Sequence, residues 1–186
     1  MSIYLLVFLL LAAWTLLEYF RPQTKIYAYW ICWAAMTGCL CLRFGQGTDY
    51  VTYQGLYETI PVAIDLSQGY FCGFYPEIGW RLLSAAFKMF DAPFWVFAST
   101  LGLAEMLLLH RFVKRFVQVR TAGLFMLYPV LYLVYMVSGL RQGLAVCLFL
   151  GIALPFLMER KWIAYVITIF LTLSFHRVAF AWLVLI

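Results

Sequence analysis

The sequence predicts an all-α protein, a polytopic bundle of transmembrane helices. Of its 186 residues, 66% are hydrophobic and 11% are charged, and the mean hydropathy is +0.93. Soluble domains are about half apolar and about a quarter charged. The apolar runs are long enough to cross a bilayer as helices, and they lack the strict alternation of barrel strands. These observations indicate a helical membrane protein.

Six spans are predicted along a single membrane domain. They cover residues 2–20, 26–42, 92–110, 121–138, 140–158 and 162–186. No basic residue precedes the first run and no small-residue cleavage site follows it, so it is expected to be a span rather than a signal peptide. The last run has no polar tail, so we expect the chain to be the N-terminal part of a longer protein.

The loops differ in charge, and this difference orients the spans. Three loops, at 21–25, 111–120 and 159–161, carry eight of the thirteen Lys and Arg residues. Because basic loops favour the cytoplasmic side, all three are expected there. The segment 43–91 carries five acidic and three basic residues. It is therefore expected to be exoplasmic.

A first short helix is predicted within the exoplasmic segment. It is expected to have Thr48 as its N-cap and to run to Ile60, just before a proline. Tyr50, Tyr53 and Tyr57 would lie on one of its faces. They could form an interfacial aromatic belt, or a platform on which sugar rings stack.

A second short helix is predicted at 77–90, too short to span the membrane. Its polar residues share one face, and they are Glu77, Arg81, Ser84 and Lys88. The other face is apolar. The pattern favours an amphipathic helix lying in the outer interface.

Several ionisable residues are expected near this outer side. Asp49 and Glu77 are each expected at the start of a short helix, where the helix dipole favours an acid, and either could act as a general base or hold substrate. Arg43 is expected at the outer end of the second span. Arg141 is expected in the first turn of the fifth span, where it could reach lipid headgroups or bind a diphosphate through paired hydrogen bonds.

His176, in the last apolar run, is expected near the outer leaflet or in a water-filled cavity. Its pKa near neutrality suits it to accept a proton. His110 adjoins a basic loop and is expected to have no catalytic role. A small-residue stripe at Gly139, Gly143 and Gly151 is expected to pack against another helix.

The five cysteines form no CxxC pair, and they are interpreted as small hydrophobic residues. No metal cluster and no nucleotide-sugar motif is visible. The sequence therefore predicts no metal, no cofactor and no nucleic-acid partner.

Four motifs resemble those of the EpsG-type, Wzy-like polymerases of bacterial exopolysaccharide and O-antigen. The stretch 43–53, RFGQGTDYVTY, resembles that family's Arg…Gly-Thr-Asp-Tyr-x-x-Tyr segment. Residues 77–82 are similar to its Glu-x-Gly-x-x-Leu, and residues 140–145 to its Arg-Gln-x-x-Ala helix start. Residues 175–179 resemble its Phe-His-x-(Ser/Thr)-Ala, with Val178 in place of the hydroxyl residue.

The resemblance implies an enzyme that polymerises lipid-linked oligosaccharide repeats on the outer face of the bacterial inner membrane. The donor would be an undecaprenyl-diphosphate-linked glycan. Arg141 and Arg43 would bind the diphosphate, and His176, Asp49 or Glu77 would supply the base.

Three further residues are expected to bind substrate, namely Tyr50, Tyr53 and Gln142. Membrane lipids, a chain-length regulator and a flippase are the expected partners. A lipid-linked glycan flippase or other transporter, a membrane acyltransferase with His176 as base, and a non-catalytic assembly subunit are the alternatives. One-sided polarity and the lack of an internal repeat favour the enzyme over a transporter.

Overall fold

The structure, a computed structural model, describes residues 2–21, 23, 25–62 and 77–185. These residues are mostly helical and include no strand. The predicted all-α fold is therefore confirmed. Part of the predicted exoplasmic segment, residues 63–76, lies outside the described residues, and so does Cys72.

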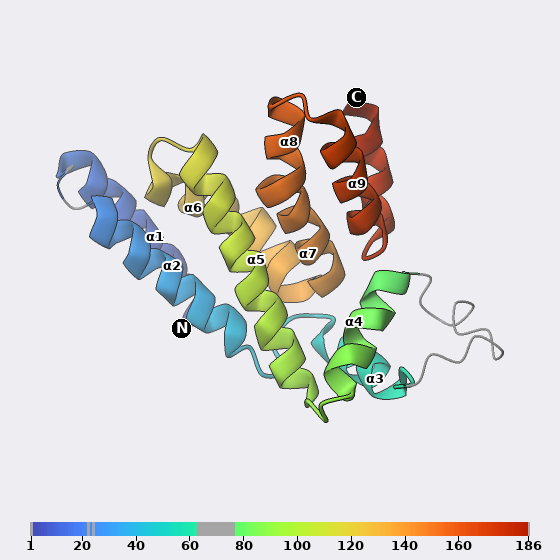
Figure 1. Cartoon of the computed structure of the whole chain (residues 1–186). Helices are drawn as coiled ribbons and strands as arrows, with labels where there is room; N and C mark the ends of the chain where they lie inside the picture. Colours follow the sequence, from blue (N-terminus) through green and yellow to red (C-terminus); the bar gives the residue numbers. More distant parts are fainter. Residues whose placement is uncertain (1, 22, 24, 63–76, 186) are drawn as a thin grey trace.

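The order of the helices along the chain can be followed in Figure 1. In order they are α1 (Ile3–Phe20), α2 (Lys25–Cys41), α3 (Tyr50–Thr59), α4 (Ile78–Lys88), α5 (Phe94–Phe116), α6 (Arg120–Leu127), the π-helix η2 (Tyr128–Ser138), α7 (Leu140–Leu148), the π-helix η3 (Phe149–Ala153), α8 (Leu154–Met158), α9 (Trp162–Leu173) and the 3₁₀ helix η4 (Arg177–Leu185).

Among the described residues, four helical runs are long and apolar enough to cross a membrane, and α9 is a shorter apolar helix. The four runs are Ile3–Phe20, Phe94–Phe116, Arg120–Ser138 and Leu140–Met158. These runs indicate a multi-pass membrane protein. Helix α5, the third predicted span, continues six residues beyond its predicted end at 110, so that Lys114 and Arg115 lie in its last turn, where the helix dipole favours cations.

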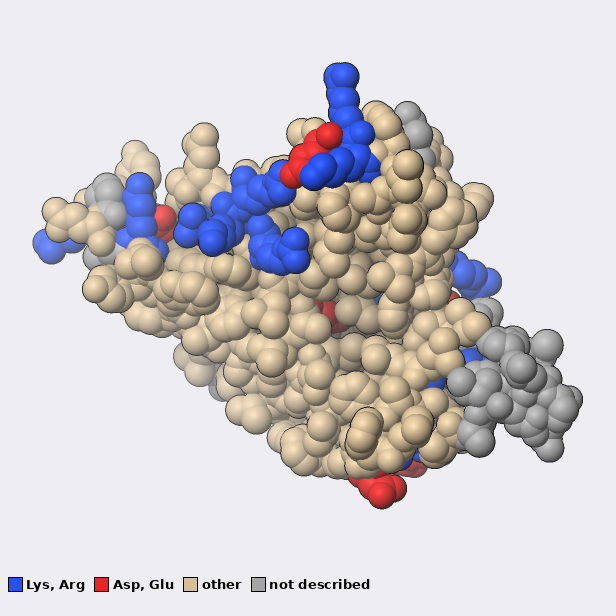
Figure 2. Space-filling view, viewed as in Figure 1, with Lys and Arg blue, Asp and Glu red and all other residues tan. Residues whose placement is uncertain are grey.

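The three basic loops lie at one end of the bundle, and α3 and α4 lie at the other (Figure 1). In the space-filling view, Lys and Arg side chains gather along the end that carries the basic loops (Figure 2). Two of the loops are linked there, because Glu159 forms ion pairs with Arg115 and with Lys161. The charge pattern of the loops therefore matches their grouping in space.

The small-residue stripe of α7 and η3 allows close helix packing, as predicted. A Cβ atom on Gly143 would lie 2.7 Å from the Tyr135 carbonyl oxygen of η2. One on Gly151 would lie 2.8 Å from the Leu108 carbonyl oxygen of α5. Cys32 and Cys147 are buried as small apolar residues among these helices.

Two local predictions are corrected by the structure. The N-cap of α3 is Asp49 rather than Thr48, because the Asp49 carbonyl accepts the first hydrogen bond of the helix, from the Tyr53 amide at 2.9 Å. Gly47, at φ +100°, forms the turn before it and lies too close to the Val137 carbonyl for any Cβ atom.

The predicted last span, 162–186, is broken between Leu173 and Arg177. In a continuous helix the Ser174 carbonyl would accept the Val178 amide. It accepts the Gly79 amide of α4 instead, at 2.7 Å, and the Val178 amide donates to the side chain of His176. A contact from a distant segment thus ends α9.

Helix α4 turns its polar face toward the protein. Glu77, Arg81 and Ser84 are buried, whereas Ile78 and Leu82 are exposed. A short helix was predicted at 77–90, and the structure has one of 11 residues there, α4. In a membrane protein such a helix can face lipid with its apolar side and line a polar site with the other.

Candidate functional site

Glu77 is the centre of a cluster of charged side chains from three separate segments. Its Oε2 atom accepts a hydrogen bond from Nη1 of Arg141 at 2.7 Å, and its Oε1 atom lies 4.0 Å from Nε of Arg177. The Glu77 side chain is 4% exposed, that of Arg141 is 19% exposed and that of Arg177 is 83% exposed. The exposure of these side chains therefore increases from the buried Glu77 through Arg141 to Arg177 at the surface.

Helix α3 contributes a fourth side chain, Tyr53. Its hydroxyl oxygen lies 3.5 Å from Nε of Arg141, and its ring centroid lies 5.6 Å from the Arg141 Cζ atom. This distance is within the range of a cation–π contact. Arg141 is thus held by a carboxylate and by an aromatic ring, which fixes the direction of its guanidinium.

Gly79 brings the start of α4 against the break between α9 and η4. A Cβ atom at this position would lie 2.3 Å from Oγ of Ser174, so only glycine fits without a shift. The Gly79–Ser174 backbone hydrogen bond described above fixes the same contact. The contact brings Glu77 close to His176 and Arg177, which lie two and three residues after Ser174 in the chain.

His176 has a defined hydrogen-bonding state. Its Nδ1 atom accepts the Val178 amide at 3.2 Å, so the neutral ring carries its proton on Nε2. The backbone of Val178 thus supplies a hydrogen bond to the ring at the position where the related motif has a hydroxyl residue. His176 also lines a cavity of about 180 Å³ with Gln142 and Tyr135. We refer to Tyr53, Glu77, Arg141, His176 and Arg177 as the Glu77–Arg141 site.

The family model of the EpsG family matches residues 26–186. The chain belongs to the EpsG family. Comparisons with curated proteins and with solved structures found no match. Membership indicates a polymerase-type role in polysaccharide biosynthesis and an enzyme of glycosyltransferase-like character. The resemblance predicted from the four motifs is confirmed.

Three of those motifs meet in this EpsG-family protein at the Glu77–Arg141 site. They are the segments at 77–82, 140–145 and 175–179. The fourth motif, at 43–53, contributes Tyr53 through α3. Tyr53 and Arg177, which lie 124 positions apart in the sequence, therefore flank the Glu77–Arg141 pair, with Tyr53 on Arg141 and Arg177 near Glu77.

Arg43 lies elsewhere in the EpsG-family chain. It is 2% exposed, and its guanidinium donates to the carbonyls of Met136, Val137 and Ala98, the last two at 3.3 and 3.5 Å. Met136 and Val137 belong to the last turn of η2, where carbonyl groups lack helical partners. In this position Arg43 joins the end of α2 to η2 and α5, and its predicted contact with substrate stays a prediction.

Asp49 and Tyr50 lie at the start of α3. Asp49 is exposed, and its side chain makes no capping hydrogen bond. Tyr50 is buried, with its ring centroid 5.0 Å from that of Phe94 in an edge-on contact. Of the predicted tyrosines, Tyr53 contacts Arg141 directly and Tyr50 packs in the core beside it.

Two residues of interest were not among the predicted site residues. Arg177 follows His176 within the same motif, and its charge was the available signal. Glu105 of α5 is completely buried, and neither of its carboxylate oxygens has a hydrogen-bond partner among the described residues. An acidic residue in the middle of an apolar span was a signal for it.

The described part of the chain contains no group of three His, Cys, Asp or Glu side chains that could hold a metal ion. The cationic groups at the Glu77–Arg141 site are instead guanidinium groups. Guanidinium groups bind phosphate oxygens through paired hydrogen bonds. The site is thus chemically suited to a phosphorylated ligand.

Proposed function

We propose that the chain polymerises lipid-linked oligosaccharide repeats on the outer face of the bacterial inner membrane, as in exopolysaccharide or O-antigen synthesis. The glycan would be transferred from undecaprenyl diphosphate to a sugar of another lipid-linked repeat. The observation that carries this proposal is Arg141, which Glu77 and Tyr53 hold at the start of α7 beside the exposed Arg177.

The reaction needs a place for the leaving group. The acceptor hydroxyl oxygen forms a bond to the anomeric carbon, and the bond from that carbon to the phosphate oxygen breaks. The electron pair leaves with undecaprenyl diphosphate. Arg141 and Arg177 stabilise this developing negative charge, which is the effect that lowers such barriers most. Their position at the end opposite the basic loops supports an outer, membrane-surface site.

His176 suits the same leaving group. Because Nδ1 is occupied by the Val178 amide, the neutral ring presents an Nε2–H donor. We assign this donor to an oxygen of the diphosphate. Gln142, which lines the same cavity, is assigned to the sugar beside it.

The acceptor proton needs a base. Glu77 is already paired with Arg141, and the lone pair of the neutral His176 is occupied. Asp49 is exposed and makes no capping bond, so we assign the proton to its carboxylate. No step of this reaction requires a metal or a cofactor. A flippase and a chain-length regulator would be the partners that supply the repeats and limit the product.

The test is complementation of a strain that lacks its repeat-unit polymerase. Wild-type protein should restore long glycan, and Arg141→Ala should leave single lipid-linked repeats exposed on the outer face. Arg115→Ala, in the exposed ion pair at the other end, is the matched control and should behave as wild type. If Arg141→Ala cells instead retain the repeats on the inner face, the chain moves the lipid-linked glycan and the proposal is wrong.

A further inference from the structure

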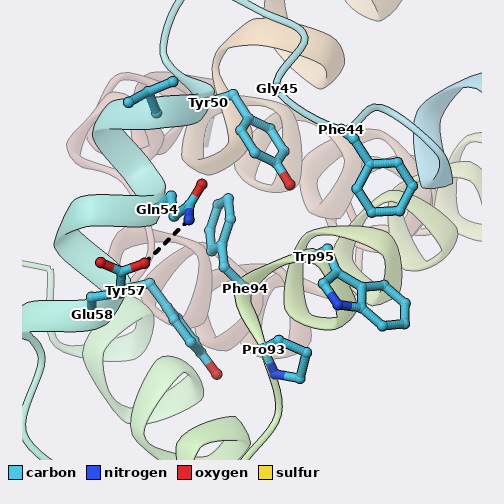
Figure 3. A pocket seen from close by; sticks show the side chains of 10 residues that line it. Phe44, Gly45, Tyr50, Gln54, Tyr57, Glu58, Pro93, Phe94 and Trp95 are labelled. Atoms are coloured by element: carbon cyan, nitrogen blue, oxygen red, sulfur yellow. Dashed lines mark hydrogen bonds between the residues drawn. The ribbon is translucent and has the colours of Figure 1, made fainter.

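A second cavity lies on another side of α3, between the turn at residues 44–45 and the start of α5 (Figure 3). Its volume is about 420 Å³. Ligand sites usually have volumes of about 300–1,000 Å³. We call it the α3–α5 pocket. It belongs to the same end of the molecule as the Glu77–Arg141 site, but the two share no lining residue.

Aromatic rings form most of the wall of the α3–α5 pocket. Phe44 and Trp95 are both exposed, with ring centroids 6.0 Å apart and planes inclined by 51°. Phe94 and Tyr50 lie deeper and are buried. Exposed aromatic faces of this kind pack against the C–H face of a sugar ring.

A polar pair on α3 faces the same pocket. Nε2 of Gln54 donates to Oε1 of Glu58 at 3.2 Å, one helical turn apart (Figure 3). This bond leaves the second carboxylate oxygen of Glu58 and the amide oxygen of Gln54 available as acceptors. Adjacent acceptors suit the paired hydroxyl groups of a sugar.

The aromatic wall and the polar pair together distinguish between two possible occupants, a lipid acyl chain and a sugar ring. A lipid acyl chain would fit the aromatic wall, but it would press hydrocarbon against the exposed Glu58 carboxylate and displace water from the oxygen that Gln54 does not contact, which is costly for a charged group. A sugar ring satisfies both surfaces, because it has an apolar face and hydroxyl edges. The pocket therefore favours a carbohydrate.

We infer that the α3–α5 pocket binds a sugar residue of the glycan other than the one attached to the diphosphate. Helix α3 connects the two places, since Tyr53 contacts Arg141 while Gln54 and Glu58 face the pocket. The inference rests on the proposed function for the identity of the glycan. Helix α3 would then hold the glycan while the reacting end of the glycan lies at Arg141.

Binding can be measured without any reaction. The probe is a set of lipid-free and phosphate-free oligosaccharides, prepared by partial acid hydrolysis of the polysaccharide made by the host cells. These are titrated by saturation-transfer NMR against the full chain in nanodiscs. Trp95→Leu and Glu58→Gln should each weaken binding about tenfold, which corresponds to losing one good contact. Trp162→Leu, a similarly exposed tryptophan at the basic end, should leave it unchanged.

A photocrosslinking residue at position 51, which lines the pocket and is exposed, identifies the occupant directly. Mass spectrometry should find the oligosaccharide attached there. Capture of phospholipid acyl chains alone, equal binding by wild type and Trp95→Leu, or no binding by wild type would each overturn the inference.

The two proposals fail in different ways. In the complemented strain, Trp95→Leu and Glu58→Gln should still join repeats but shift the product to shorter glycan. Arg141→Ala should abolish joining. If no variant of the chain restores polymer, yet position 51 captures oligosaccharide, then the pocket binds glycan and the proposed polymerase activity is wrong.

Discussion

Two glutamates in this protein each contact two cations, at opposite ends of the bundle. Glu77 lies between Arg141 and Arg177, and Glu159 lies between Arg115 and Lys161. The side chain of Glu77 is 4% exposed, and that of Glu159 is 33% exposed. Glu77 joins segments from α4, α7 and η4, whereas Glu159 joins one loop to the end of α5.

The comparison shows that the same set of charges has different consequences in different surroundings. Water and salt screen the Glu159 group, and such exposed pairs contribute little to stability. At Glu77 the carboxylate is removed from water, so losing its pairing with Arg141 would leave a buried charge without compensation and would destabilise the fold. A buried pair also fixes the orientation of the guanidinium group, and paired hydrogen bonds to a phosphate require a defined orientation.

The largest expected difference is between Glu77→Gln and Glu159→Gln. Glu77→Gln replaces the carboxylate that accepts a hydrogen bond from the partly buried Arg141 with a neutral amide, so the guanidinium is held less firmly. Removing one partner of a buried pair costs about 3–5 kcal/mol, and losing the orientation of a charge-stabilising group lowers rates about 100-fold or more. Glycan length in the complemented strain and thermal unfolding in detergent measure both effects. If Glu159→Gln has an equal effect, burial is not what separates the two sites.

The next effect comes from Gly79→Ala, which acts on the site through packing. The added methyl group would clash with Ser174 and move Glu77 away from Arg177. Overpacking of this kind costs about 1–3 kcal/mol, and glycan synthesis should fall about tenfold, by analogy with the misplacement of positioning groups. Gly55→Ala on α3 is the control, because a Cβ atom there would meet no atom within 4 Å. Wild-type polymer from Gly79→Ala would contradict the role of this contact.

Arg177→Ala should reduce activity without changing stability. Its side chain is 83% exposed and 4.0 Å from Glu77, so its removal leaves no cavity and no buried charge. We expect about tenfold less polymer and an unchanged thermal midpoint, with partial recovery in Arg177→Lys, which keeps the charge but not the planar fork. Arg160→Ala, an exposed arginine in the basic end, should leave both quantities unchanged.

The smallest effect concerns pH at the basic end. Side-chain hydrogen bonds from Lys161 and Arg115 lower the pKa of Glu159 from 4.5 to about 2. A lowered pKa in the folded state means that the interaction stabilises the protein fully above about pH 4.5 and is lost as the pH falls toward 2. Wild type and Glu159→Gln should therefore have the same pH dependence of thermal unfolding from pH 5 to 8. They should converge only in acid, and a difference that grows toward pH 8 would contradict this assignment.

Much of the fold follows from local properties of the sequence. Hydropathy is a sum over about 20 neighbouring residues, so the ends predicted for the long apolar runs lie within six residues of the ends of α1, α5, α6–η2 and α7–α8. Amphipathic periodicity placed α4 in the same way. The end of α9 could not be placed by such sums, because the carbonyl that would continue it bonds to Gly79, about a hundred residues earlier in the chain.

The sequence predicted which residues belong to the candidate site better than it predicted how they are arranged. Motif resemblance selected Glu77, Arg141 and His176, which lie together with Arg177. It also selected Arg43, which the structure places against backbone carbonyls of η2 and α5. Charge and motif do not reveal which of two arginines meets a carboxylate and which meets a helix end, since both partners are distant in sequence.

The sequence by itself determined the helical membrane character, the charge difference between the two ends and the family, because each depends on composition or on short motifs. The tertiary structure alone decided that α4 turns its polar face inward, that α9 stops at Leu173 and that Glu77 lies between two arginines. Each of these three features depends on which hydrogen-bond or ion-pair partner a polar group contacts in the folded chain. In this chain those partners come from segments that only folding brings together.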